Sequence, residues 1–205
     1  MELLADDSTK NAKDAKKDGK DFFAILAREG SKRELRFKKM DKEIIRNYRQ
    51  EFLSTLPADS PYRDKKFLTE GWGDSPEMAD ELGALIAAGT KTATCSALWE
   101  WEAEGESPPE TGTVTIVVDG CGEPLCIVET VEVAVRNYNG VDADFAREEG
   151  EGDLSLEYWR EAHRRFFSRS LSKIGREFSE DMPLVCERFR LIYTPETVLL
   201  KKIRE

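Results

Sequence analysis

Lys91 is the residue whose type and placement most suggest chemistry. It is the only lysine between Lys66 and Lys173, and it lies in the run GTKTATCS at residues 89–96. This run places a primary amine beside several hydroxyl groups, directly after a segment with helical periodicity. Such an ammonium can bind an anion or assist a hydroxyl nucleophile. A solvated surface lysine is the alternative interpretation.

A second candidate is the acidic run EEGEGD at residues 148–153, in which four carboxylates surround two glycines. Like charges this close raise one another's pKa, which suits a general acid or base. Helix capping by Asp153 or Ser155 is the alternative explanation, because carboxylates also favour the N-terminal end of a helix.

Three further side chains each have two interpretations. His163 lies one helical turn after Trp159, where packing is more common than catalysis. Arg160, on the same segment, can contact a substrate phosphate or pair with neighbouring glutamates. Trp99 can stack on a nucleobase or fill the core.

The chain shows no metal or cofactor motif. Its four cysteines form no Cys-x-x-Cys pair and no zinc spacing, and it has one histidine. We therefore expect no metal site, no cofactor, and reduced thiols in the protein interior. No glycine-rich phosphate loop is found either.

Composition indicates a globular protein rather than a membrane protein. Of the 205 residues, 40% are hydrophobic and 35% are charged, and no run approaches the roughly 20 apolar residues of a membrane span. The first residues lack the basic start and apolar run of a signal peptide. We therefore expect a cytoplasmic location.

Charge is unevenly distributed along the chain. Residues 1–66 hold 17 Lys and Arg against 13 Asp and Glu, a net charge of +4, whereas residues 67–205 hold 14 against 28, a net charge of −14. An acidic domain repels the phosphates of extended duplex nucleic acid. A nucleoside, a nucleotide or a short RNA segment can still bind in a local pocket.

The pattern along the chain divides it into four parts. We expect a polar, mobile tail at residues 1–20, a helical extension at 21–66, a folded domain at 67–195 and a short tail at 196–205. Within the extension, helices are predicted at residues 21–29 and 41–56, and Pro57 and Pro61 then mark a boundary.

The folded domain is predicted to be α+β. Ser75, Pro76 and Gly89 indicate the start and end of a helix at residues 75–88. Strands are expected at 113–118, 125–135 and 184–193, the first two joined by a hairpin turn, with helices at 142–148 and 155–168. The alternation of strands and helices is too sparse for a doubly wound sheet.

Four segments in this order, at residues 73–82, 89–96, 149–163 and 179–189, resemble the ASCH-domain family. The resemblance covers about residues 67–193 and points to the longer, bacterial-type subgroup. It implies a PUA-like fold, a small β-barrel with flanking helices, and a cleft where the lysine motif meets the acidic loop. It also implies a role in RNA metabolism.

The resemblance also implies a set of site residues. Some small relatives hydrolyse N4-acetylcytidine with a Lys, a Thr three residues later and a Glu, which fall here on Lys91, Thr94 and either Glu151 or Glu149. Those enzymes have an arginine where this chain has Ser96. The missing basic contact then has to come from elsewhere, for which Arg160 is a candidate, and Trp99 is a candidate to stack the base.

Two classes of function follow from these residues. In a hydrolase, Lys91 of lowered pKa would take the proton of Thr94, and Glu151 would orient the lysine or pass the proton to the leaving amine. If RNA is cleaved, Lys91 would instead stabilise charge on the phosphate. The alternative is a non-catalytic module that recognises RNA or a modified base.

Overall fold

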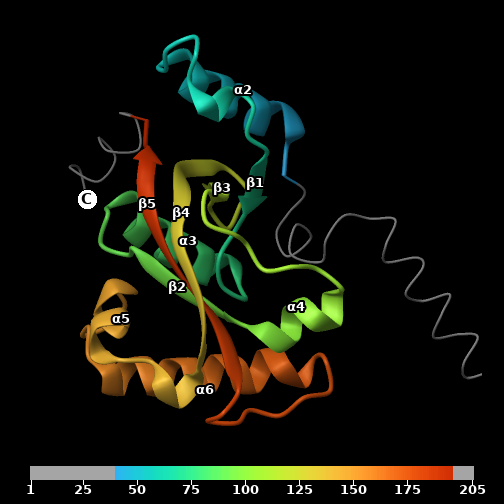
Figure 1. Cartoon of the computed structure of the whole chain (residues 1–205), viewed down its shortest axis with the longest axis vertical. Helices are drawn as coiled ribbons and strands as arrows, with labels where there is room; N and C mark the ends of the chain where they lie inside the picture. The colour runs from blue at the N-terminus through green and yellow to red at the C-terminus, as the bar shows by residue number, and fades with distance from the viewer. Residues whose placement is uncertain (1–39, 196–205) are drawn as a thin grey trace, which may run out of the picture.

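A computed structural model describes residues 40–195 of the chain (Figure 1). The tails expected at residues 1–20 and 196–205 and the helix expected at 21–29 lie outside these residues. The elements follow the order α2 (Lys42–Ser54), η1 (Pro61–Arg63), β1 (Phe67–Glu70), α3 (Pro76–Ala87), β2 (Ala93–Ala97), α4 (Leu98–Glu104), β3 (Val114–Val118), β4 (Pro124–Asn137), η2 (Tyr138–Gly140), α5 (Ala143–Glu148), α6 (Leu156–Ser172) and β5 (Pro183–Tyr193).

The five strands form one sheet in the order β1-β3-β4-β5-β2. β1 runs parallel to β3, and the other neighbours are antiparallel. β4 and β5 are the longest strands and pair along most of their length, with register shifts that bend the pair. The two longest strands, β4 and β5, therefore lie next to each other in the sheet, and the short strands β1 and β2 form its edges.

The helices cover the sheet in separate places. α2 lies at the end of the sheet opposite α6 (Figure 1). Its Tyr48, Phe52 and Leu53 pack against the apolar side chains of β3 and of Ile127 in β4. α3 packs through Ile86 and Ala87 against the same two strands.

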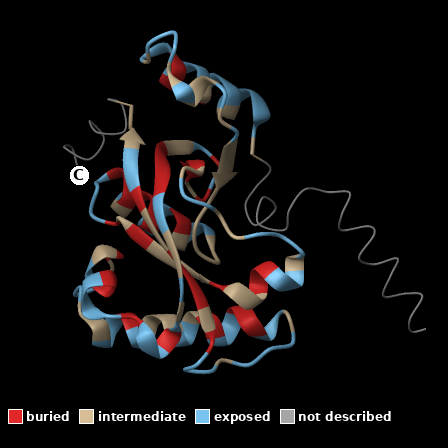
Figure 2. Cartoon of the chain, in the orientation of Figure 1, coloured by how far each residue is buried: buried red, intermediate tan, exposed pale blue. Residues whose placement is uncertain are grey.

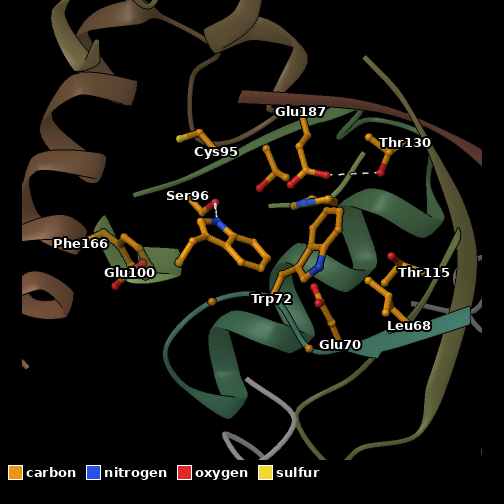
Figure 3. A pocket seen from close by; sticks show the side chains of 15 residues that line it. Leu68, Glu70, Trp72, Cys95, Ser96, Glu100, Thr115, Thr130, Phe166 and Glu187 are labelled. Atoms are coloured by element: carbon orange, nitrogen blue, oxygen red, sulfur yellow. Dashed lines mark hydrogen bonds between the residues drawn. The ribbon is translucent and has the colours of Figure 1, made fainter. Parts of the chain in front are cut away.

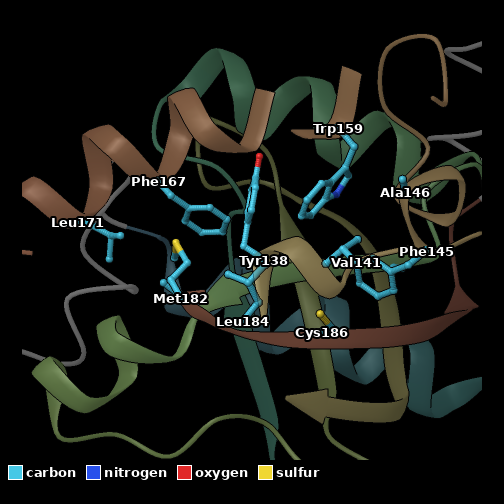
Figure 4. Packing of buried hydrophobic residues seen from close by; sticks show 12 residues of the cluster. Tyr138, Val141, Phe145, Ala146, Trp159, Phe167, Leu171, Met182, Leu184 and Cys186 are labelled. Atoms are coloured by element: carbon cyan, nitrogen blue, oxygen red, sulfur yellow. The ribbon is translucent and has the colours of Figure 1, made fainter. Parts of the chain in front are cut away.

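α5 and α6 enclose the largest of the three cores. Trp159, Phe167 and Leu171 of α6 pack with Tyr138 and with Leu184 of β5 (Figure 4). Buried positions concentrate on the central strands and on the inner faces of the helices, while the outer faces are exposed (Figure 2). None of the helices within residues 40–195 combines the length and apolarity needed to cross a membrane.

The expected α+β class with flanking helices is confirmed, and the predicted helix and strand positions agree with α2, α3, α5, α6, β3, β4 and β5. The described strands form an open sheet rather than a closed barrel, because β1 and β2 are its two edges and do not pair with each other. Three elements, β1, β2 and α4, were missed: all three are short and lack a clear period of two or of 3.6.

Candidate functional site

The lysine segment is held in place by backbone hydrogen bonds to two distant elements. Gly89 ends α3 with a left-handed φ of +73°, which turns the chain toward β2. The Thr92 amide then donates to the Glu148 carbonyl oxygen at 2.8 Å, and the Thr92 carbonyl accepts from Phe189 N at 2.9 Å. Lys91 is thereby fixed between the end of α5 and β5.

Lys91 is buried, with 1% of its surface exposed. Its Nζ donates to Glu149 Oε2 and to Glu151 Oε1, both at 2.7 Å, and to the Glu149 carbonyl oxygen at 3.3 Å. All three donor hydrogens of the ammonium thus have acceptors on the acidic loop. A solvated surface lysine, the alternative interpretation of the sequence, is wrong.

These contacts fix the charge of the lysine. Burial alone would lower the pKa of Lys91, but the charges and hydrogen bonds of Glu149 and Glu151 outweigh burial and raise this pKa above its usual value. The same ion pair holds the pKa of Glu149 below its usual value, although burial acts to raise it. Lys91 is therefore an ammonium and Glu149 a carboxylate at neutral pH.

Glu149 connects the lysine to α6. Its Oε1 accepts a hydrogen bond from Trp159 Nε1 at 3.1 Å and lies 3.6 Å from His163 Nε2. The His163 ring stacks on the Trp159 ring with centroids 4.2 Å apart, and its Nδ1 lies 2.9 Å from the Trp159 carbonyl oxygen. One turn of α6 therefore supplies both neighbours of this carboxylate oxygen.

The acidic loop approaches the lysine segment so closely that it requires a glycine. Gly150 has φ +72°, and a Cβ at this position would lie 2.7 Å from the Thr90 carbonyl oxygen and 3.0 Å from Lys91 Cα. Only a residue without a side chain fits both the conformation and the space. The approach allows Glu149 and Glu151, on either side of Gly150, to reach the same ammonium.

Two adjoining cavities, each of about 100 Å³, open beside this network. Trp72, Gly73, Thr94, Cys95 and Phe166 line both of them. We call the cavity that Glu149, Glu151 and His163 also line the inner cavity. The other, the outer cavity, is lined in addition by Glu70, Ser96, Glu100, Trp101 and Glu187 among others (Figure 3).

The segment that holds this arrangement matches a known protein family. The profile of the ASCH domain matches residues 69–193, more than half of the chain. The chain belongs to the ASCH domain family. Every residue of the network described above lies within the matched range.

Solved structures of ASCH relatives show the same fold. The ASCH domain from Lactobacillus crispatus JV V101 is 37% identical, with a TM-score of 0.70, and the match covers 77% of this chain and 98% of that one. Protein EF3133 from Enterococcus faecalis V583 is 35% identical, with a TM-score of 0.65, and covers 75% of this chain and 95% of its own. Among curated proteins, none matches significantly.

The ASCH domain brings some of the expected site residues together. Lys91, Glu149 and Glu151 are in direct contact, so both glutamates left open by the sequence lie in the network. Thr94 lines the two cavities beside them. Ser96 lines the outer cavity, where its Oγ accepts from Trp101 Nε1 at 2.9 Å.

Two other expected residues lie elsewhere. Arg160 is exposed and lines neither cavity. Trp99 also lines neither cavity, and its ring packs under the Arg176 guanidinium, 4.6 Å from ring centroid to Cζ. Arg160 therefore does not line the cavity in which Ser96 lies, and its role as the basic contact stays a prediction.

Sequence reasoning missed several lining residues. Trp72 lies just before the first segment of the family resemblance and Glu187 lies within the last one, but neither was assigned to the site, and Cys95 was interpreted only as a core thiol. The run ATCSA at residues 93–97 has no clear alternation, so no local pattern indicated that Thr94 and Cys95 lie on a strand beside the cavities. Cys95, Glu149 and His163 are also the described residues whose donor atoms gather closely enough to hold a metal ion.

Proposed function

We propose that this ASCH-domain protein is a hydrolase of RNA or nucleoside metabolism that removes an acyl group from a modified nucleoside such as N4-acetylcytidine. One observation carries the proposal: a fully buried ammonium, paired with two glutamates, lies beside a cavity that Thr94 lines. Burying the charges of Lys91 and Glu149 costs free energy that folding alone does not require, which favours a functional role.

The roles of the residues differ from those expected. Lys91 was expected to have a lowered pKa and to act as the base, but its raised pKa keeps it protonated. Glu151 is the better base, because its side chain is 25% exposed and lines the inner cavity together with Thr94. In the proposal Lys91 orients the Glu151 carboxylate and offsets negative charge that develops nearby.

The reaction then has two balanced steps. Glu151 takes the hydroxyl proton of Thr94 as Thr94 Oγ attacks the acyl carbon, and the amine leaves with the proton returned by Glu151. Water next attacks the resulting ester and gives a proton to Glu151. Glu151 passes this proton to Thr94 Oγ as the carboxylic acid leaves, which restores both the Thr94 hydroxyl and the Glu151 carboxylate. Lys91 keeps its proton throughout.

The outer cavity supports a nucleobase rather than a phosphate as the bound group. Glu70, Glu100 and Glu187 line it, and carboxylates repel phosphate but accept hydrogen bonds from the amino groups of bases. The Trp72 ring lies between Glu70 and Glu187 and adds an aromatic surface, while Glu100 lies apart from it, beside Phe166 (Figure 3). A nucleoside, or one base extruded from a short RNA, fits this lining.

The test is turnover of N4-acetylcytidine by the purified protein, measured as release of cytidine, with short RNAs as a second substrate class. Thr94→Val keeps the shape of the side chain and removes the nucleophile, so kcat should fall by roughly 100-fold or more, as it should for Glu151→Gln. Thr92→Val is the matched control, because Thr92 lines neither cavity and its hydroxyl only reaches the Glu148 carbonyl. Equal turnover by Thr94→Val and wild type contradicts the proposal.

A non-catalytic role in recognising a modified base is the second candidate, and the aromatic and acidic lining of the outer cavity favours it. It predicts saturable binding of the nucleoside without product, retained in Thr94→Val and weakened in Trp72→Ala. Isothermal titration with the same nucleoside series separates the two functions.

A further inference from the structure

Three side chains from separate elements meet at the inner cavity with the donor atoms of a transition-metal site. Cys95 comes from β2, Glu149 follows α5, and His163 comes from α6. A thiol sulfur, a carboxylate oxygen and a ring nitrogen, one from each, all lie within 4.8 Å of one another. All three residues line the inner cavity, so the group is open on one side.

The His163 ring is oriented as a metal ligand would be. A carbonyl oxygen cannot donate a hydrogen bond, so the 2.9 Å contact between Nδ1 and the Trp159 carbonyl places a proton on Nδ1. The opposite nitrogen, Nε2, then faces Glu149 Oε1 at 3.6 Å. Two lone pairs at that distance repel each other unless a proton or a metal ion lies between them. Metal-bound histidines commonly donate their other N–H to a carbonyl in this way.

The Glu149 carboxylate is held by hydrogen bonds to both of its oxygens, and Oε1 faces His163. Lys91 Nζ occupies Oε2 at 2.7 Å, and Trp159 Nε1 donates to Oε1 at 3.1 Å, which leaves a lone pair of Oε1 on the side of His163. Both neighbours fix the orientation of the carboxylate, as the supporting residues of metal sites do.

Charge in the network also favours a cation. Lys91 offsets only one of the two carboxylates that it contacts, so the pair Glu149 and Glu151 leaves one negative charge in excess. A divalent metal ion bound there would displace the thiol proton to solvent and form a metal–thiolate bond.

We propose that Cys95, Glu149 and His163 form a site for Zn²⁺ or a chemically similar divalent transition metal, with a fourth position open to the inner cavity. Sulfur, nitrogen and oxygen ligands together suit Zn²⁺ and Co²⁺ rather than Mg²⁺ or Ca²⁺. Three protein ligands with an open position are the pattern of catalytic rather than structural zinc. Thr94 lines the same cavity.

The sequence predicted no metal site because the three ligands are separated by more than 50 and by 14 residues and fit no known spacing. The proposal goes beyond the proposed hydrolase function and does not depend on it, since Thr94, Glu151 and Lys91 need no metal in the steps given above.

Co²⁺ titration of the full chain, after treatment with a chelator and removal of the chelator, tests the site directly. Co²⁺ should bind at one ion per chain with the d–d absorption of a tetrahedral site and a thiolate-to-metal charge-transfer band, and Zn²⁺ should displace it. Cys95→Ser should abolish the charge-transfer band, and His163→Gln should weaken binding by at least about 10-fold. Cys121→Ser is the matched control, because Cys121 is exposed and lines neither cavity.

A charge-transfer band that survives Cys95→Ser, or the absence of any bound Co²⁺, would overturn the proposal. NMR of the wild-type protein is a second measurement, which tests the proposal even if a variant does not fold. The chain has a single histidine, so its ring nitrogens give one unambiguous pair of NMR signals. Zn²⁺ should shift Nε2 to a metal-bound position and leave Nδ1 protonated.

If Nε2 carries a proton and its NMR signal does not change when Zn²⁺ is added, His163 is an imidazolium paired with Glu149, and the metal site is rejected. None of these measurements uses substrate turnover. Loss of the metal site with retained Thr94-dependent hydrolysis, and the converse, are therefore distinguishable results.

Discussion

At the scale of single residues, Lys91 shows how burial and pairing decide chemistry. A buried lysine without partners tends to lose its proton, which is what a catalytic base needs. Here two glutamates reverse that tendency, so the side chain is a fixed positive charge. Of Lys91, Glu149 and Glu151, only Glu151 has a partly exposed side chain, so it is the group that can still react.

Replacing this charge should be costly. Lys91→Met leaves Glu149 buried without its cation, and removing one partner of a buried pair typically costs about 3–5 kcal/mol. Urea unfolding measures the loss. Adding Glu149→Gln to Lys91→Met should recover part of it, because no uncompensated carboxylate is then left at that position. Lys66→Met, at an exposed position, should change stability by less than about 0.5 kcal/mol. A Lys91→Met protein as stable as the wild type would contradict the ion pair between Lys91 and Glu149.

At the scale of elements, a second charge cluster joins the segment before β1 to β4 and β5. Lys65 Nζ donates to Glu129 Oε1 at 2.8 Å, and Tyr62 and Arg190 donate to Oε2 at 2.8 Å and 2.6 Å. Burial alone would raise the pKa of Glu129, but these hydrogen bonds lower it from 4.5 to about 2.

This shift predicts an acid-dependent loss of stability. A carboxylate whose pKa is lower in the folded than in the unfolded state stabilises the fold above the unfolded pKa, and the contribution is lost as pH falls through the folded pKa. Glu129 should therefore contribute up to about 3 kcal/mol at pH 6, which disappears between about pH 4.5 and pH 2. Glu129→Gln should flatten that part of the stability-versus-pH curve, and the exposed Glu123→Gln should not. An unchanged slope in Glu129→Gln would show that the cluster contributes nothing.

Strand pairing places two thiols opposite each other. Cys95 of β2 is directly opposite Cys186 of β5. Phe189 N donates to Thr92 O, three residues before Cys95, and bonded and non-bonded pairs alternate along an antiparallel ladder. Cys95 and Cys186 thus occupy a non-bonded pair, where Cα atoms lie about 4.5 Å apart, within the range of a disulfide.

A thiol oxidant such as diamide should therefore link Cys95 to Cys186. Peptide mapping under non-reducing conditions detects the linked peptides, and Cys121→Ser prevents linkage between molecules through the exposed thiol. Linkage of Cys95 to any other cysteine would contradict the register of β2 on β5.

Sequence patterns located most elements but not the contacts between them. Ser75 and Gly89 indicated the ends of α3 because capping is a local property. The meeting of Lys91 with the acidic loop was implied by family resemblance alone, since nearly 60 residues separate them. The approach of Trp72 and Glu187 to the outer cavity depends on sheet order, which no local pattern encodes.

At the scale of the whole molecule, α2 shares a core with the sheet. The boundary expected at residue 66 stays a prediction, but Phe52 of α2 is 2% exposed and contacts the rings of Tyr62, Phe67 and Tyr193. This packing couples the segment before residue 67 to the strands that carry the site.

The coupling predicts a single unfolding transition. Phe52→Ala should lower the free energy of unfolding by about 3–5 kcal/mol, because the cavity that it leaves lies inside a shared core. All four tryptophans lie outside α2, so their fluorescence reports on the rest of the domain. Ile44→Ala, at a 37% exposed position of the same helix, is the matched control. If Phe52→Ala leaves the unfolding transition measured by tryptophan fluorescence unchanged, α2 unfolds separately from the rest of the domain.

Because Gly150 is in contact with Thr90 and Lys91, a substitution at position 150 can separate the loss of the site from the loss of the whole protein in a genetic experiment. A single methyl group at position 150 cannot be accommodated against the Thr90 carbonyl, so Gly150→Ala should push the acidic loop away from the lysine. The three hydrophobic cores contain neither residue 150 nor its contacts, so the change should cost no more stability than the loss of the Lys91–Glu149 pair. An allele with this substitution would produce a folded, expressed protein in which the acidic loop and Lys91 no longer meet. Any cellular trait lost with this allele could be assigned to the site.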